Sequence, residues 1–349
     1  MYYPIKFIPV YKDYIWGGRY FERFGRELPE GKLAESWELS CHKNGVSTAA
    51  NGSFQGQLLT DIVKTDPLNI LGKNFPAGCQ EVPLLIKLID ANENLSVQVH
   101  PDDNYAAVFE GGTGKNEIWY VVDARPGAKL VAGLKPGVTR EAFLQSIQED
   151  RIEECLQQVE VQSGDVLHIP CGLLHSIGAG IVVAEIQQTS DITYRVYDYN
   201  RVDSSGIRRP LHVDKAISVV DFSRPFSQTK IPGVEITLDN AGTKTVYLAN
   251  SFFALEKYSL DGDTSETTDG SKFYVYLCLE GKGKVLSDEM EVDFTAGETF
   301  LIPASMGEYT LQGRFTALKT YAPDLRTDII GIMRNAGCSN EQILTVLSR

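Results

Sequence analysis

The sequence predicts a mainly β protein made of two copies of one β module, with a few α-helices at its periphery. Short runs of β-branched and aromatic residues, separated by Gly, Asp, Asn and Pro, fill most of the chain, for example in 115–134 and 271–287. This texture is typical of β-barrels and sandwiches. Helical periodicity is confined to three segments, and one stretch of the first half recurs in the second.

The recurring stretch is 164–178, which aligns without a gap to 297–311. Each copy begins with a glycine and an acidic residue and has a proline at its seventh position. Upstream, 117–127 aligns with 271–281, and both end in a glycine turn. Two strand-turn-strand units of one kind are expected, which divide the chain into 1–235 and 236–349. The second copy replaces three residues of the first, namely Glu117, His168 and His175, by Ser271, Leu301 and Glu308.

The three helical segments are 55–72, 139–159 and the tail from 326 to 349. Thr139 is suited to an N-cap and Gly337 to a C-cap. Their amphipathic patterns indicate helices that pack on the outside of a β core.

The stretch LSVQVHPDD, 95–103, predicts a strand with one polar face. Apolar and polar residues alternate, so that Ser96, Gln98 and His100 share a face, and Pro101 then ends the hydrogen-bonding ladder. A hydroxyl, an amide and an imidazole are therefore presented together where the strand stops. The loop that follows carries two aspartates and a glycine-rich tip.

Composition excludes several classes of protein. The chain has 349 residues, 43% of them hydrophobic, which is ample for a buried core. Its formal charge of −13 disfavours nucleic acid and anionic membranes as partners. We see no leader or membrane-spanning segment, so a cytoplasmic location is expected. Six cysteines without a C-x-x-C pair predict reduced thiols and neither a disulfide framework nor a thiolate zinc site.

Residues on two motifs are candidates for a metal site. The pattern G-x₅-P-x-G-x₂-H, ending at His175, is the second half-motif of the cupin barrels, in which a Gly-Pro turn directs the histidine into the barrel mouth. The first half-motif, H-x-H followed by Glu, is matched by Gln98-x-His100 and Glu117. Two imidazoles, a carboxylate and an amide oxygen suit a borderline divalent ion with one position left open. The remaining histidines, His42, His168 and His212, are interpreted as structural or surface residues.

Four separated segments resemble the type I mannose-6-phosphate isomerases, which are zinc enzymes built from paired cupin barrels. These segments are LSVQVHPDD, KNEIWY, GDVLHIPCGLLHSIG and EIQQTSDITYRVYDYNR, in family order. The resemblance is strongest between 83 and 201, and IWGGR at 15–19 and AESWELS at 34–40 support it. It implies two cupin-type (jelly-roll) β-barrels. The short region before 164 implies the compact bacterial form of the family.

The resemblance also implies roles for individual residues. One Zn²⁺ per chain, with other divalent metals possible, is expected on Gln98, His100, Glu117 and His175. The implied catalytic residues are Arg195, Lys115, Asp191 and Glu35, among which the last three are unranked candidates for the base. Substrate binding is assigned to Ser96, Lys87 and Trp16. Structural alternatives remain for two of these residues: Lys87 as a solvated lysine at a strand end, and Arg195 as the partner of Asp191 or Asp198.

The predicted activity is the interconversion of mannose 6-phosphate and fructose 6-phosphate by proton transfer through an enediol. A divalent ion would stabilise the enediol oxygens, and local cations would hold the phosphorylated hexose. Two alternatives stay open: another metal-cupin enzyme, such as an oxygenase or decarboxylase, and a non-catalytic sugar-phosphate-binding cupin. We expect a monomer or homodimer, with a structural or pocket-walling role for the second barrel.

Overall fold

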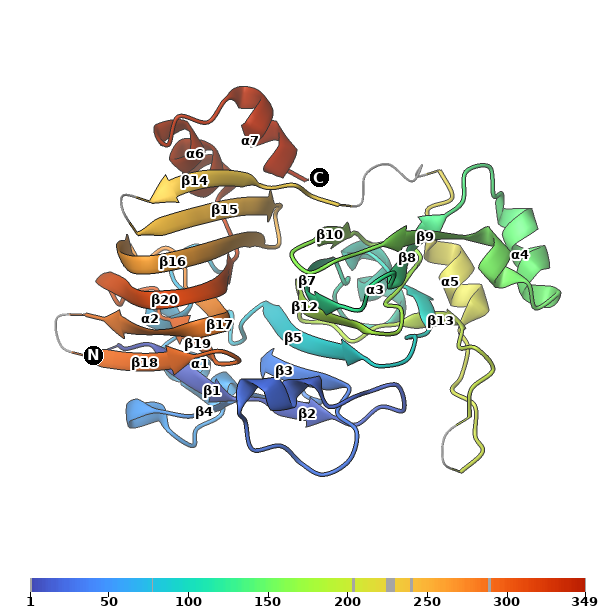
Figure 1. The fold of residues 1–349 in the computed structure, drawn as a ribbon, viewed down its shortest axis with the longest axis horizontal. Helices are drawn as coiled ribbons and strands as arrows, with labels where there is room; N and C mark the ends of the chain where they lie inside the picture. The colour runs from blue at the N-terminus through green and yellow to red at the C-terminus, as the bar shows by residue number, and fades with distance from the viewer. Residues whose placement is uncertain are drawn as a thin grey trace.

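Strands dominate the computed structural model, which describes residues 2–76, 78–202, 205–223, 230–238, 241–287 and 290–348 (Figure 1). The strands pair antiparallel in three sheets of six, five and nine strands. The mainly β prediction is therefore confirmed. Within the described residues each path of paired strands is open at both ends, so the pairing does not by itself form a closed barrel.

The first half of the chain forms the six-stranded and five-stranded sheets. The six strands, in spatial order, are β10 (Val166–Ile169), β7 (Glu117–Ala124), β12 (Ile181–Gln188), β5 (Leu84–Ala91), β3 (Glu35–Leu39) and β2 (Val10–Lys12). The five strands are β13 (Tyr194–Tyr197), β6 (Val97–Val99), β11 (His175–Ser176), β8 (Lys129–Leu134) and β9 (Leu156–Glu160). The two sheets enclose an apolar core that includes Trp119, Val183, Leu130 and Ile177.

The six-stranded sheet is covered on both faces. Every residue of β5 and β12 is buried, because the face turned away from the first core packs against the second half of the chain. That contact joins Ile86 and Ile186 to Phe273 and Leu318 in one apolar cluster. Double burial explains why these strands consist of nearly continuous apolar runs and do not alternate.

The second half, together with two short strands of the first half, forms the nine-stranded sheet at the left of Figure 1. Its strands are β14 (Val234–Leu238), β15 (Gly242–Ala249), β16 (Ala254–Thr267), β20 (Glu308–Tyr321), β17 (Tyr274–Leu286), β19 (Thr299–Ile302), β1 (Ile5–Ile8) and β4 (Thr48–Ala49), with β18 (Glu291–Thr295) beside β17. A row of glycines, Gly262, Gly313 and Gly283, crosses the three longest strands. A Cβ on Gly313 would lie 2.6 Å from the carbonyl oxygen of Lys282, so the backbones of these strands approach closely at this row.

The internal repeat is visible in the sheets, with one correction to its alignment. Gly164 and Gly297 both adopt positive φ, 91° and 86°, in the turns that precede β10 and β19. Upstream of these turns, however, Ile169 pairs with Glu117 whereas Ile302 pairs with Tyr274. Tyr274 thus holds the ladder position of Glu117, not Ser271 as the sequence alignment predicts. The sequence alignment treated Gly127 and Gly281 as equivalent turn glycines. They are not equivalent, because β17 continues through Gly281.

Two of the three predicted helical segments are confirmed as helical. Residues 55–72 contain α1 (Leu59–Thr65) and α2 (Pro67–Ile70). The tail contains the π-helix η4 (Leu325–Gly331), α6 (Ile332–Asn335) and α7 (Asn340–Val346), and Gly337 follows α6 with φ of 81°.

The third segment is helical only in part. It begins as α4 (Arg140–Gln148), with the Thr139 side chain accepting from the amide of Ala142, and continues as the 3₁₀ turn η3 (Ile152–Cys155). Its end was predicted wrongly, because Leu156–Glu160 is the strand β9. Pairing with β8 overrides the local helical pattern there.

The remaining helices fall where the sequence predicts none. They are η1 (Tyr20–Phe24), η2 (Gly52–Phe54), α3 (Asp103–Phe109) and α5 (Val213–Val219). The expected loop after Pro101 therefore contains a helix, which Asp102 caps by accepting from the amide of Tyr105 at 2.8 Å. Among the described residues, none of the helices has the length and apolar character needed to cross a bilayer.

Candidate active site

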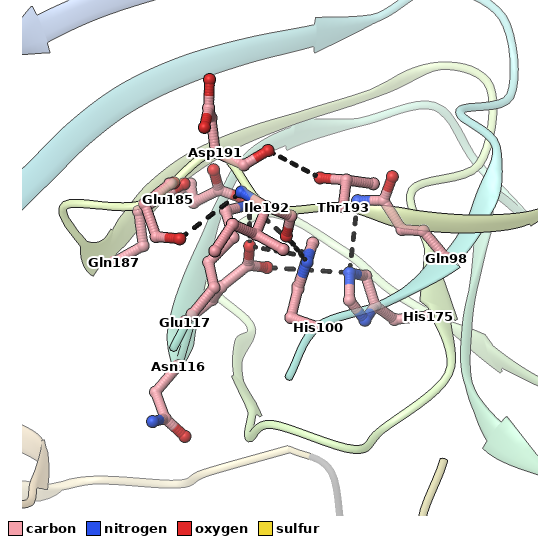
Figure 2. A network of polar contacts seen from close by, with 12 residues as sticks. Gln98, His100, Asn116, Glu117, His175, Glu185, Gln187, Asp191, Ile192 and Thr193 are labelled. Carbon is pink, nitrogen blue, oxygen red and sulfur yellow. Dashed lines mark hydrogen bonds and ion pairs between the residues drawn. The ribbon is translucent and has the colours of Figure 1, made fainter. Parts of the chain in front are cut away.

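The potential metal ligands meet where the five-stranded and six-stranded sheets approach each other. The pairing of β6 with β11 sets Gln98 opposite His175, with 3.3 Å between the amide Nε2 and the imidazole Nε2. His100 follows β6, and Glu117 begins β7 of the other sheet. Figure 2 shows the two imidazoles and the Glu117 carboxylate directed at one another. One ligand atom from each of His100, Glu117 and His175 lies within 4.8 Å of the others.

Backbone carbonyls orient both imidazoles. His100 Nδ1 donates to the carbonyl oxygen of Ile192 at 2.7 Å, and His175 Nδ1 donates to that of Leu173 at 2.9 Å. Each ring therefore presents its unprotonated Nε2 to the cluster. His100 Nε2 lies 3.2 Å from Glu117 Oε1, and His175 Nε2 lies 3.9 Å from Glu117 Oε2. Such second contacts fix the tautomer that a metal-binding histidine requires.

The protonation states suit a cation. Burial, followed by the charge of Lys115, lowers the pKa of His100 to about 4, and burial also lowers the pKa of His175. Burial acts to raise the pKa of Glu117, but Lys115 and His100 hold that pKa well below its ordinary range. At neutral pH the cluster is thus two neutral imidazoles and one carboxylate, which is the donor set that divalent transition ions bind.

Lys115 lies inside this cluster. Its Nζ donates to Glu117 Oε1 and lies 3.4 Å from His100 Nε2, in a fully buried setting. A positive charge is therefore already placed against these ligand atoms, where it balances the Glu117 carboxylate.

A row of four side chains crosses the six-stranded sheet beside the cluster. The register aligns Trp37, Lys87, Glu185 and Trp119 on β3, β5, β12 and β7. Lys87 Nζ lies 3.1 Å from Glu185 Oε1 and 3.8 Å from Glu35 Oε2. Burial acts to lower the pKa of Lys87, but these two carboxylates raise it above its ordinary value. Lys87 is therefore a buried, paired ammonium, and its interpretation as a solvated lysine is wrong.

The tryptophans of this row orient its carboxylates. Trp37 Nε1 donates to Glu35 Oε2 at 2.7 Å. Trp119 Nε1 lies 3.1 Å from Glu117 Oε2 and 3.0 Å from Glu185 Oε2. It therefore links the carboxylate of the candidate metal site to the carboxylate of this row.

Arg195 lies at the mouth of the site. Its Nε donates to Ser96 Oγ at 3.2 Å and its Nη1 to the carbonyl oxygen of Pro210 at 3.0 Å. Asp198 is instead paired with two other arginines, Arg201 and Arg209.

Asp191, the other partner considered for Arg195, lies on the rim. Its Oδ2 accepts from Asn44 Nδ2 at 2.5 Å, and its Oδ1 is 3.4 Å from His42 Nε2. The hydrogen bonds of Arg195 therefore run to Ser96 and the backbone, and not to either aspartate.

One cavity of about 370 Å³ collects nearly all of the predicted site residues. Those that line it are Trp16, Glu35, Lys87, Ser96, Gln98, Lys115, His175, Asp191 and Arg195. His100 and Glu117 are not among the lining residues, but both contact Lys115. Trp16 is almost completely buried in the wall.

Sequence reasoning missed several lining residues. These are Lys12, Tyr14, Trp37, Asn44, Trp119, Glu185, Arg209 and His212. His212 was interpreted as structural or surface, yet its Nδ1 accepts from the backbone amide of Arg195 at 3.3 Å. Most of the others depend on strand register, which leaves no signal in a single stretch of sequence. For Arg209 and His212, the sequence offers only the adjacent Arg208-Arg209 pair as a signal.

Comparison with known proteins identifies the family. Residues 5–123 match the model of the type I phosphomannose isomerase catalytic domain, and residues 243–322 match the mannose-6-phosphate isomerase cupin domain. The chain is 37% identical over 318 residues to "Probable mannose-6-phosphate isomerase GmuF" of Bacillus subtilis, covering 90% of the chain and 97% of that protein. The chain belongs to the type I phosphomannose isomerase family.

Further relatives of this family match along nearly their whole length. Mannose-6-phosphate isomerase ManA of B. subtilis is 34% identical, with 89% of the chain and 96% of ManA covered. The crystal structure of a mannose 6-phosphate isomerase from B. subtilis superimposes with a TM-score of 0.84 at 31% identity, covering 91% and 99% of the two chains. The catalytic-domain match contains Gln98, His100 and Glu117, whereas His175 and Arg195 lie beyond it.

Proposed function

We propose that the chain interconverts mannose 6-phosphate and fructose 6-phosphate in the cavity between the two N-terminal sheets. The observation that carries the proposal is the buried His100, Glu117 and His175 cluster, which opens into a cavity lined by cations, in a member of the type I phosphomannose isomerase family. The oxygenase, decarboxylase and non-catalytic alternatives would not require Lys115 and Arg195 beside an intact ligand cluster.

The proposed metal ligands are Gln98, His100, Glu117 and His175, and the proposed ion is one Zn²⁺ per chain. Zn²⁺ favours nitrogen and carboxylate donors in four-coordinate sites, and three ligands here are already held in the required protonation state. Gln98 directs Nε2 at His175 and Oε1 at Ser96, so a half-turn of its amide presents the oxygen. When bound, the ion would supply a Lewis acid for the carbonyl and hydroxyl oxygens that share charge in the enediol.

The substrate phosphate is proposed to bind where Arg195 and Ser96 meet. Arg195 Nε donates to Ser96 Oγ, so a phosphate placed there would meet a guanidinium and a hydroxyl together. Lys87 is proposed as a contact to the sugar or phosphate, although two carboxylates already balance its charge. Trp16 would supply an apolar wall for the hexose.

The isomerisation moves one proton between neighbouring carbons and one between their oxygens, with no net gain or loss. Lys115, Glu35 and Asp191 are the proposed candidates for the carbon-bound proton. Position favours Lys115 and Glu35, because both reach the cavity from its buried side. Asp191 is half-exposed on the rim and accepts from Asn44. A base works best where water is excluded and the substrate is held against it.

Several coarser features remain predictions that accompany this function. We propose that the three sheets represent two cupin-type barrels, divided near residue 235, although β1 and β4 of the first half pair within the C-terminal sheet. A cytoplasmic location and a monomer or homodimer complete the proposal.

A coupled assay for fructose 6-phosphate formed from mannose 6-phosphate tests the proposal. The protein is assayed as purified, after chelation, and after addition of Zn²⁺, Mn²⁺ or Fe²⁺. We expect turnover to disappear on chelation and to return best with Zn²⁺. Absence of turnover from Zn²⁺-loaded, folded protein would reject the isomerase. Recovery with Fe²⁺ alone, accompanied by oxygen consumption, would support an oxygenase instead.

A further inference from the structure

A second cavity, of about 790 Å³, lies in the C-terminal sheet and shares no lining residue with the candidate active site. Its walls come from β15, β16, β17 and β20, and the tail helices η4 and α6 close one side. We call this cavity the tyrosine pocket. Its charged and aromatic lining includes Lys244, Glu256, Glu266, Tyr274, Lys319 and Tyr321.

The tyrosine pocket occupies the position that the active site holds in the first copy of the repeat. Tyr274 has the ladder position of Glu117, since each pairs with the isoleucine before the conserved proline. Glu308 aligns with His175, begins a strand as His175 does, and also lines the pocket. The repeated module therefore has a cavity at the same place in both halves.

Charges in the tyrosine pocket are buried and matched. Lys319 Nζ donates to Glu266 Oε2 at 2.9 Å, and Lys244 Nζ lies 3.8 Å from Glu256 Oε2. At the edge, Asp328 is paired with Lys272 at 2.9 Å, and Glu308 is exposed. No lysine of the pocket is left without a carboxylate, so an anionic ligand would gain no net attraction. A cation would likewise gain no net attraction from carboxylates that are already paired with ammonium groups.

One buried carboxylate oxygen of the tyrosine pocket lacks a hydrogen bond. Glu256 is 2% exposed, and its Oε1 accepts from Tyr321 at 2.8 Å. Its Oε2 is buried and accepts no hydrogen bond in the described part of the chain. Buried carboxylate oxygens are normally satisfied by a donor. A ligand hydroxyl at this oxygen would supply one.

Aromatic rings provide the rest of the surface. Lys319 Nζ lies 3.9 Å from the centre of the Tyr274 ring, and Tyr274 meets Tyr321 edge to face at 5.1 Å. The Tyr309 hydroxyl, which is 2.8 Å from that of Tyr276, adds a polar group at the floor. Alternating carboxylates, ammonium groups and tyrosines match the alternating hydroxyls and apolar face of a sugar ring.

We propose that the tyrosine pocket binds an uncharged sugar or sugar alcohol, with one hydroxyl donating to Glu256 Oε2. This site is distinct from the isomerase site and takes a ligand without phosphate. The size of the cavity accommodates a monosaccharide.

Titration calorimetry on the full-length protein tests the proposal, with D-mannose, D-fructose, D-glucose and D-mannitol as probes. Four variants are compared with the wild type. Glu256→Gln replaces the acceptor by an amide, and Ser265→Trp narrows the pocket from an exposed position on its rim. Glu291→Gln is the matched control on an exposed strand, and His175→Ala disables the active site.

We expect at least one probe to bind the wild type, the control and His175→Ala alike, and to bind Glu256→Gln about tenfold more weakly. Ser265→Trp should weaken binding as well, and it keeps the test valid if Glu256→Gln fails to fold. Isomerase turnover should be unchanged in both pocket variants. Absence of binding by all four probes would overturn the proposal. Loss of binding in His175→Ala with retention in Glu256→Gln would do the same, since the probe would then occupy the active site.

Discussion

The two halves of the chain repeat one arrangement of strands but differ in where those strands are interrupted. In the first half the ladder stops at short strands, β6 with three residues and β11 with two, and His100 and His175 lie at these breaks. In the second half β16, β17 and β20 continue without a break for 13 or 14 residues and are crossed by their row of glycines. In the first half, the polar side chains at the strand breaks point toward a common centre. In the second half, the polar side chains of the continuous strands are paired with one another.

Removal of a ligand from the first half should produce the largest effect. We expect His100→Ala to lower kcat/KM by roughly a thousandfold, because loss of bound metal removes several kcal/mol of charge stabilisation in the transition state. Steady-state kinetics and metal analysis on the same preparation measure both losses. His168→Ala is the control, because His168 contacts Ser348 away from the cavity. Equal losses in the two variants would contradict the assignment of His100.

Replacement of the mouth arginine should have the next largest effect. Arg195→Lys keeps the charge but loses the planar donor that reaches Ser96, so kcat/KM should fall about 10- to 100-fold, mainly through KM for mannose 6-phosphate. Arg314→Lys, at an exposed position of the C-terminal sheet, should leave the kinetics unchanged. A fall in kcat alone would show that Arg195 acts on the reacting carbons and not on the phosphate.

The close approach of the long strands in the second half can be tested through their glycines. Gly313→Ala places a Cβ against the carbonyl of Lys282 at a φ of 136°, so it should lower the free energy of unfolding by about 1–3 kcal/mol. Gly307→Ala, with positive φ but open space around it, should cost less. Urea unfolding compares the two. Equal destabilisation would show that φ, and not close approach of the strands, requires the glycine.

The smallest expected effect is a dependence of stability on pH that belongs to the second half. Burial acts to raise the pKa of Glu266, but Lys319 and Lys244 hold it below its ordinary value. The ionised carboxylate therefore stabilises the fold above the pKa of the unfolded chain, and this contribution is lost as pH falls through the lower pKa of the folded state. Melting temperatures at pH 7 and pH 4 should differ less for Glu266→Gln than for the wild type. An unchanged difference would argue against this pair as the source.

Sequence reasoning was most successful where chemistry is local. The Gln98-x-His100 pair, Glu117 and the Gly and Pro turns before His175 predict a metal site, and the structure brings His100, Glu117 and His175 together. The row from Trp37 to Trp119 could not be predicted, because it depends on the register of four strands that are buried on both faces and show no alternation. β9 was mistaken for a helix for a related reason, since its pairing with β8 outweighs its local pattern. The repeat was recognised, but its upstream register was wrong by three residues. The error arose because β17 continues through Gly281, which the alignment treated as a turn.

The placement of β1 has a consequence for synthesis of the chain. Ile5 pairs with Leu301, so β1 leaves the ribosome well before the strand β19 with which it pairs. At about 5–20 residues per second, close to 300 residues separate the two events by roughly 15–60 seconds. During that interval β1 can pair only with β4. Its other edge, which later pairs with β19, is exposed. A newly made chain is thus vulnerable to aggregation until β19 has been made, because β1 keeps an unpaired edge until then.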